Sequence, residues 1–193
     1  MARGEIRSPW DAILAEAGIG THIGQLYWND RRLLRALTVF VYSGLDRGDA
    51  VLLVMIPEHQ NELLRRMARD PRRIEEPERP GQLAFIDAER LLEEILVDGV
   101  PVPELFEDRI RDRIAAARQR SATGKVRIFG ETVGLLWQTD LPAAIRLAEI
   151  CHELTIREPV AVFCAYRVAP REGGVQPDFP EELANLHSHL IPV

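Results

Sequence analysis

The sequence predicts an α/β protein, a three-layer sandwich with helices on both faces of a mostly parallel central sheet of about five or more strands. One observation is the order of the segments: short apolar stretches alternate with longer ones whose apolar residues recur at helical spacing. A second is that segments 50–56 and 160–166 are apolar at every position. Such segments are typical of central parallel strands covered on both faces. The length of 193 residues fits one domain.

Each predicted element has local signals at its ends. Ser8 and Pro9 indicate the start of a first helix, because serine can cap it and proline loses no hydrogen bond at the first helical position. A first strand that carries His22 follows, and the next helix is expected to stop at Gly44 and Gly48. The remaining predicted strands are 50–56, 83–86, 126–129 and 160–166. The remaining predicted helices are centred on 63–67, 91–96, 104–119, 142–154 and 180–188.

Charge and composition argue against several classes of protein. Lys and Arg number 24 against 30 Asp and Glu, and the net charge of −6 repels nucleic acid and anionic membranes. The N-terminus lacks the apolar region of a signal peptide, and no apolar run approaches the ~20 residues that span a bilayer. Cys151 and Cys164 each lie in an apolar segment, which favours buried thiols in a reduced compartment. We therefore expect a cytoplasmic protein that binds neither nucleic acid nor membranes.

Ligands of α/β proteins usually bind outside the carboxyl ends of the strands. The residues predicted at those ends are Gln25 to Trp28, Pro57 to Gln60, Asp87, Gly130 with Glu131, and Arg167. This mixed set suits a small polar or amphipathic ligand better than a polyphosphate. A phosphate site would need a glycine-rich loop with a lysine, and the segment Tyr27-Trp28-Asn29-Asp30 after the first strand has neither. Nucleotide hydrolysis is therefore disfavoured.

Metal-binding and nucleophilic motifs are also missing from the sequence. His187 and His189 are closely spaced, but no His-x3-His or Cys-x2-Cys pair supports them, so we expect no metal and no cofactor. No Gly-x-Ser-x-Gly segment exists, and we do not expect an enzyme. Acid–base chemistry by His22, Glu58 and Glu131 would require that the three converge. His22 itself is open to two interpretations, a core histidine bonded to a backbone carbonyl or a contact to a ligand.

Several segments together resemble one known family. They are His22-Ile23-Gly24-Gln25-Leu26-Tyr27, Gly48-Asp49-Ala50, Pro57-Glu58-His59, Phe85-Ile86-Asp87-Ala88, Asp98-Gly99-Val100-Pro101, Val126-Arg127-Ile128-Phe129-Gly130-Glu131 with Leu136-Trp137, Cys164-Ala165-Tyr166 and His187-Ser188-His189. In their order and spacing these segments resemble the MEDS domain, the methanogen/methylotroph DcmR sensory domain of bacterial and archaeal signalling proteins. The resemblance covers the chain from about Gly20 to its end.

The resemblance implies a sensor of small molecules, such as simple hydrocarbon derivatives. It also implies a fold similar to the RecA/KaiC-like nucleotide-binding core without its phosphate loop. The family's histidine and tyrosine carry over onto His22 and Tyr27, and its acid after the fourth strand onto Glu131. Family members are often fused to an output module, whereas Met1 to Ile19 reads as about one helix. We therefore divide the chain into an N-terminal helical extension, 1–19, and a MEDS-like sensory domain, 20–193.

The resulting hypothesis is a stand-alone sensory domain of prokaryotic signal transduction or transcriptional control, which binds a small organic ligand at the carboxyl edge of its sheet. The residues expected to contact the ligand are His22, Gln25, Tyr27, Glu58, His59, Glu131 and Trp137. Its expected partner is a second copy or a separate output protein. Two alternatives remain at this point: a degenerate RecA/KaiC-like nucleotide-binding protein, with weak ATPase or hydrolase activity, or a protein–protein interaction module with a vestigial pocket.

Overall fold

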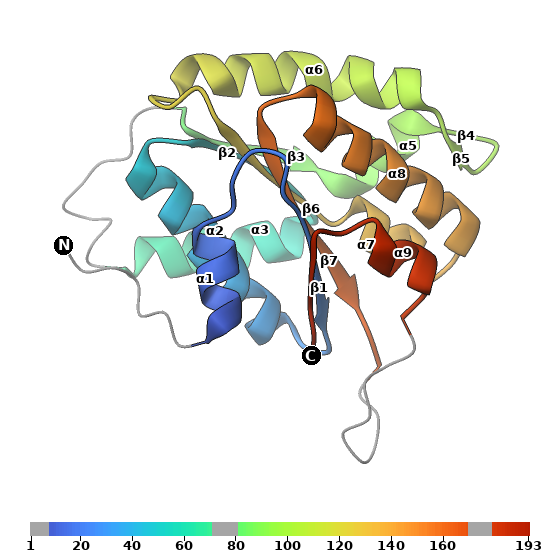
Figure 1. The fold of residues 1–193 in the computed structure, drawn as a ribbon, viewed down its shortest axis with the longest axis horizontal. Helices are drawn as coiled ribbons and strands as arrows, with labels where there is room; N and C mark the ends of the chain where they lie inside the picture. The colour runs from blue at the N-terminus through green and yellow to red at the C-terminus, as the bar shows by residue number, and fades with distance from the viewer. Residues whose placement is uncertain (1–7, 71–80, 170–178) are drawn as a thin grey trace.

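A computed structural model of the protein describes residues 8–70, 81–169 and 179–193. These residues form the predicted three-layer α/β sandwich, with a parallel sheet between two layers of helices (Figure 1). The predicted connection from Asp70 to Pro80 and the predicted loop from Val168 to Pro177 lie largely outside the described residues. Over the described ranges, no helix has the length and apolar character needed to cross a bilayer.

Over the described part of the chain, the central sheet has six strands, all parallel, in the order β3-β2-β6-β7-β1-β8. The strands are β1 (His22–Tyr27), β2 (Ala50–Met55), β3 (Leu83–Asp87), β6 (Val126–Gly130), β7 (Val160–Arg167) and β8 (His189–Ile191). Every residue of β2 is buried, as is every residue of β7 except Arg167. Burial on both faces explains why these two segments are apolar throughout.

Helices cover both faces of the sheet (Figure 1). One face carries α1 (Pro9–Ala15), α2 (Asp30–Arg47) and α3 (Pro57–Ala68), and we call it the α2 face. The opposite face, the α8 face, carries α5 (Ala88–Ile95), α6 (Pro103–Arg120), α7 (Thr132–Leu136), α8 (Leu141–Arg157) and α9 (Glu181–Asn185). Each face has its own apolar core. The aromatic rings of Phe40 and Phe163 meet in the core of the α2 face, with centroids 5.3 Å apart.

The predicted helix ends are confirmed where the sequence carries capping residues. The Ser8 hydroxyl accepts a hydrogen bond from the Asp11 N–H at 3.2 Å and caps α1. Asn29 caps α2 in the same way, through the Arg32 N–H at 3.0 Å. Gly48 ends α2 in the left-handed region, with φ at 84°, a conformation that glycine adopts without steric cost. Gly44, the other glycine expected to stop this helix, lies inside it.

The C-terminal region differs from the prediction of one helix over 180–188. The helix α9 is only five residues long, and the chain then forms β8, which pairs with β1 and places Ile23 beside His189. A three-residue strand is too short to show an apolar period, so the sequence did not reveal it. A second feature missed by the prediction is a small antiparallel hairpin of β4 (Leu96–Val97) and β5 (Val100–Pro101), at the predicted chain break.

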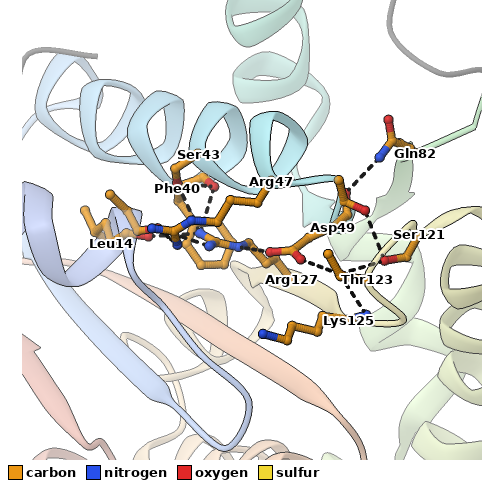
Figure 2. Close-up of polar contacts among 12 residues, drawn as sticks. Leu14, Phe40, Ser43, Arg47, Asp49, Gln82, Ser121, Thr123, Lys125 and Arg127 are labelled. Carbon is orange, nitrogen blue, oxygen red and sulfur yellow. Dashed lines mark hydrogen bonds and ion pairs between the residues drawn. The ribbon is translucent and has the colours of Figure 1, made fainter. Parts of the chain in front are cut away.

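A buried arginine ties the N-terminal helix to the sheet, as Figure 2 shows. Arg127 on β6 is 1% exposed, and its Nε donates to the Asp49 carboxylate at 3.0 Å. Its remaining N–H groups donate to the carbonyl oxygens of Leu14, Ala15 and Phe40 and to the hydroxyl of Ser43. Two of these acceptors are the last residues of α1, so one guanidinium fixes α1, α2 and β6 relative to one another. A buried charge is tolerated here because it is paired and hydrogen-bonded.

Candidate functional site

Five side chains meet at the carboxyl edge of the sheet. They are Tyr27, Asp30, His59, Glu131 and Arg167, which we call the edge network. Tyr27 and Arg167 end β1 and β7, Glu131 follows β6, and Asp30 and His59 lie in the first turns of α2 and α3. Since parallel strands end at one edge, residues far apart in sequence converge there. The structure thus brings together three of the residues predicted to contact a ligand, namely Tyr27, His59 and Glu131.

Glu131 is the most deeply placed acid of the edge network. It is 4% exposed, and its own N–H donates to the Val54 carbonyl at 3.0 Å, which holds the residue against the end of β2. Its Oε2 accepts the Ile56 N–H at 2.8 Å, and its Oε1 lies 2.5 Å from Nδ1 of His59. Both carboxylate oxygens therefore have partners, as a buried carboxylate requires.

His59 lies between two acids. Its Nδ1 faces Glu131, and its Nε2 lies 3.5 Å from Oδ1 of Asp30. Burial disfavours the charged imidazolium and acts to lower the pKa of His59. The hydrogen bond that His59 donates to Glu131 and the negative charges of Glu131 and Asp30 outweigh burial, so the pKa is raised above 6.5. A buried imidazole with a raised pKa and carboxylates on both sides is suited to holding or transferring a proton.

Arg167 closes the edge network from the solvent side. Its guanidinium pairs with the Asp30 carboxylate, and the two side chains are 48% and 49% exposed. The same guanidinium lies over the Tyr27 ring, 5.6 Å from the centroid. Burial, followed by the charge of Glu131, raises the pKa of Tyr27 to about 12. Tyr27 is therefore a neutral phenol at physiological pH.

The connection between β1 and α2 is too short for a phosphate-binding loop. It consists of Trp28 and Asn29 alone, and the Asn29 side chain is used in capping α2. Trp28 is 41% exposed, with the Arg32 guanidinium 4.5 Å from its ring centroid. The N-terminus of α2, which would attract a phosphate, already carries the Asp30 carboxylate.

His22 lies away from the edge network, contrary to the expectation that it shares a site with Gln25 and Tyr27. It is the first residue of β1 and Tyr27 is the last, and the five steps between them, at roughly 3.3 Å each, separate their Cα atoms by about 16 Å. Side chains also alternate between the faces of a strand. His22 contacts Cys164 on the α8 face, whereas Tyr27 belongs to the core of the α2 face.

A second polar group, which we call the histidine cluster, surrounds His22. It consists of His22, Cys164, Tyr166 and His187. His22 Nδ1 is bonded to the Leu186 carbonyl at 2.8 Å, and the Cys164 sulfur lies 3.4 Å from its Nε2. Of the two interpretations of His22 left open by the sequence, the structure shows the core histidine bonded to a backbone carbonyl. Burial, followed by the nearby His187, lowers the pKa of His22 to about 3, so the ring is neutral.

The other predicted contact residues lie in three different places. Gln25 is buried in β1, and its Oε1 has no hydrogen-bond partner within the described residues. Trp137 is on the α8 face, where its ring packs on Phe179 and Tyr166; its buried Nε1 is also without a partner in the described part of the chain. Glu58 is exposed in the first turn of α3. The structure therefore does not bring these three residues together.

Asp30 and Arg167 were not chosen as contact residues from the sequence. Arg167 was expected at a strand end, and Asp30 at the start of a helix is an ordinary capping acid. The ion pair between them connects residues 137 positions apart in the sequence, so only the folded structure reveals it. In the sheet, β1 pairs with β7 and Tyr27 lies opposite Arg167, so a correct prediction of the strand order would have pointed to Arg167 as a site residue.

Comparison with known families identifies a sensory domain. The family model of the MEDS domain (MEthanogen/methylotroph, DcmR Sensory domain) matches residues 21–187. The chain belongs to the MEDS family. No curated protein matches it. The match confirms the resemblance seen in the sequence, and the family's description supports a sensory role. The edge network and the histidine cluster both lie inside the matched range, so both are parts of the MEDS domain itself.

Proposed function

We propose that this MEDS domain senses a small organic molecule that binds at the edge network, in prokaryotic signal transduction or transcriptional control. One observation carries the proposal: the buried pair of His59 and Glu131 lies at the carboxyl edge of the sheet, beneath a half-exposed ion pair of Asp30 and Arg167. This is the edge at which open α/β sheets bind their ligands.

The outer ion pair of the edge network, Asp30 with Arg167, is easier to separate than the inner pair, His59 with Glu131. An ion pair between half-exposed side chains contributes about 0–1 kcal/mol, so Arg167 can leave Asp30 at little cost. The His59–Glu131 pair is buried and costly to break. A ligand with a hydrogen-bonding head group would therefore displace the outer pair and bind to the inner one, and its apolar part would contact the rings of Tyr27 and Trp28.

The same contacts explain how binding could be transmitted. Asp30 is the first residue of α2 and His59 is in the first turn of α3, so a head group that replaces the Asp30–Arg167 contact changes what holds both helices. A ligand acts on a protein only through its different affinity for two states. In one proposed state Asp30 and Arg167 are in contact, and in the other they are apart. A second copy of the domain or a separate protein would bind the two states with different affinity.

Nucleotide binding is supported less well. The connection of Trp28 and Asn29 leaves no loop to surround phosphates, and the carboxylates of Asp30 and Glu131 lie where such a loop would place its ligand. A fluorescence melting curve with ATP and magnesium tests this. We expect no rise in melting temperature, because a ligand stabilises only a native state to which it binds. A rise of several degrees would favour the nucleotide-binding alternative.

Calorimetric titration with propanol, propionate and dichloromethane tests the proposal. We expect at least one of these probes to bind the wild-type protein, and Glu131→Gln and His59→Gln to weaken that binding by about tenfold or more, since each removes a buried polar contact. Glu62→Gln is the matched control, because Glu62 is a partly exposed acid on α3 outside the edge network. A probe that binds the wild type and both edge variants equally well would place the ligand elsewhere.

A further inference from the structure

The histidine cluster contains three side chains whose donor atoms face one another. One nitrogen of His22, one nitrogen of His187 and the sulfur of Cys164 all lie within 4.8 Å of one another, and no other group of this kind occurs in the described ranges 8–70, 81–169 and 179–193. Both imidazole rings are close, with centroids 4.2 Å apart. The three residues come from the start of β1, the middle of β7 and the turn after α9. Their separation in sequence explains why no metal-binding spacing was visible.

Backbone carbonyls fix the orientation of both imidazoles. Nδ1 of His22 lies 2.8 Å from the Leu186 oxygen, and Nδ1 of His187 lies 2.7 Å from the Leu183 oxygen. A carbonyl can only accept, so each Nδ1 carries the proton and each Nε2 presents a lone pair. Metal-binding histidines almost always donate their second N–H in this manner, which fixes the tautomer before the metal arrives.

The lone pairs of the two rings face the other two side chains of the histidine cluster. Nε2 of His22 lies 3.4 Å from the Cys164 sulfur, and Nε2 of His187 lies 3.1 Å from the Tyr166 hydroxyl. For Zn²⁺, bonds of roughly 2.0 Å to nitrogen and 2.3 Å to sulfur at a tetrahedral angle place these atoms about 3.5 Å apart. The first distance is close to this value. A metal ion on Nε2 of His187 would replace the contact of that nitrogen with the Tyr166 hydroxyl oxygen, so the buried Tyr166 ring has to shift when the metal binds.

The fold makes room for this arrangement at a glycine. A Cβ atom at Gly24 would lie 2.9 Å from Cδ2 of His187, closer than side chains pack. Glycine therefore allows the His187 ring to lie against β1, next to His22.

We propose that His22, Cys164 and His187 form a binding site for Zn²⁺ or a similar borderline-soft divalent metal ion. Imidazole and thiolate are the ligands these ions prefer, and three protein ligands leave the fourth tetrahedral position open. On binding, the Cys164 thiol loses its proton to solvent and the sulfur bonds to the metal, while both imidazoles keep their Nδ1 protons on the carbonyls. The site is at the opposite end of β1 from the edge network, so the proposal does not depend on the proposed function.

Cobalt titration of the chelator-treated protein tests the site, because a thiolate bound to Co²⁺ gives a charge-transfer band in the near ultraviolet. We expect a band that saturates at one Co²⁺ per chain and disappears when Zn²⁺ is added. Absence of a saturable band in the wild-type protein overturns the proposal. This measurement needs no variant, so it does not depend on whether a substituted protein folds.

Two matched pairs of variants identify the ligands, each checked for folding by far-ultraviolet circular dichroism. Cys164→Ser should lose the band and Cys151→Ser should keep it, although both thiols are buried and in contact. His187→Gln should weaken Co²⁺ binding by at least tenfold, whereas His189→Gln, two residues away and exposed, should leave it unchanged. A band that survives Cys164→Ser, or equal losses in the two histidine variants, contradicts the assignment. His59→Gln should not affect the band, which separates this site from the edge network.

Discussion

At the level of single residues, the environments of His59 and His22 shift the pKa of the imidazole in opposite directions. His59 is buried between carboxylates, and its charged form is favoured. His22 is buried beside a thiol, other imidazoles and a backbone carbonyl, and its charged form is disfavoured. Burial acts in the same direction on both rings, so the charge of the neighbours decides the difference.

The raised pKa of His59 predicts a pH-dependent contribution to stability. The folded-state value lies above the unfolded value of about 6.5, so the stabilisation is complete below that pH and is lost as pH rises through the folded-state pKa. His59→Gln should therefore lower the free energy of unfolding most at low pH, by about 1–3 kcal/mol, with a shrinking difference above pH 6.5. Urea unfolding of both proteins between pH 5 and pH 9 measures this.

The exposed histidine at position 189 provides the control for that experiment. His189→Gln should lower the free energy of unfolding by less than about 0.5 kcal/mol across the series, since surface substitutions have small effects. A difference between the wild type and His59→Gln that grows as pH rises would contradict the assignment of the Glu131 and Asp30 charges as the dominant neighbours.

At the scale of secondary-structure elements, the short helix α7 determines where Glu131 lies. The helix starts directly after Glu131 and packs on β7 through a glycine: a Cβ atom at Gly134 would lie 2.1 Å from the Ala165 carbonyl oxygen. Backbone meets backbone at this contact, so no side-chain movement can relieve a clash. The close approach keeps α7 against the sheet and, with it, the turn that directs Glu131 to His59.

Gly134→Ala should therefore both destabilise the protein and disturb the edge network. We expect a loss of about 1–3 kcal/mol in the free energy of unfolding, the usual cost of overpacking, measured by urea denaturation. Gly130→Ala is the matched control, because nothing lies within 4 Å of a Cβ atom at Gly130. Equal stability of the two variants would show that α7 can move without cost.

At the scale of the whole molecule, the fold was predictable in outline and the sites were predictable in part. Apolar segments such as 50–56 identify strands directly, because burial on both faces leaves no polar position. The odd spacing between His22 and Tyr27 already implied opposite faces of one strand. The pairing of Asp30 with Arg167 and the approach of His187 to His22 depend on strand order and on β8, which no local pattern encodes.

The N-terminal helix α1 is predicted to contribute to the stability of the whole domain. Removing residues 1–17 deletes the buried Leu14 side chain and leaves Arg127 N–H groups without their Leu14 and Ala15 acceptors. Losing a buried apolar side chain alone costs about 2–5 kcal/mol. At about 2–4 °C per kcal/mol for a chain of this length, the melting temperature should fall by roughly 5 °C or more.

Calorimetric melting of the truncated and full-length proteins tests this prediction. Leu14→Ala in the full-length chain is the intermediate control: it should lower the melting temperature less than the truncation, because it retains the carbonyl oxygens that accept from Arg127. An unchanged melting temperature after truncation would mean that α1 is not part of the folding unit.

The position of β8 has a consequence for the order in which the molecule assembles. Strand β1 is synthesised well before its outer neighbour β8, and the bond from His22 to Leu186 spans 164 positions. Contacts between such distant residues form slowly, because the closing of a long loop must come first. Until the ribosome has released residues 186–191, β1 has an open edge that can pair with a strand of another chain. The segment 186–191, which brings His187 to the histidine cluster, therefore also covers this edge of β1.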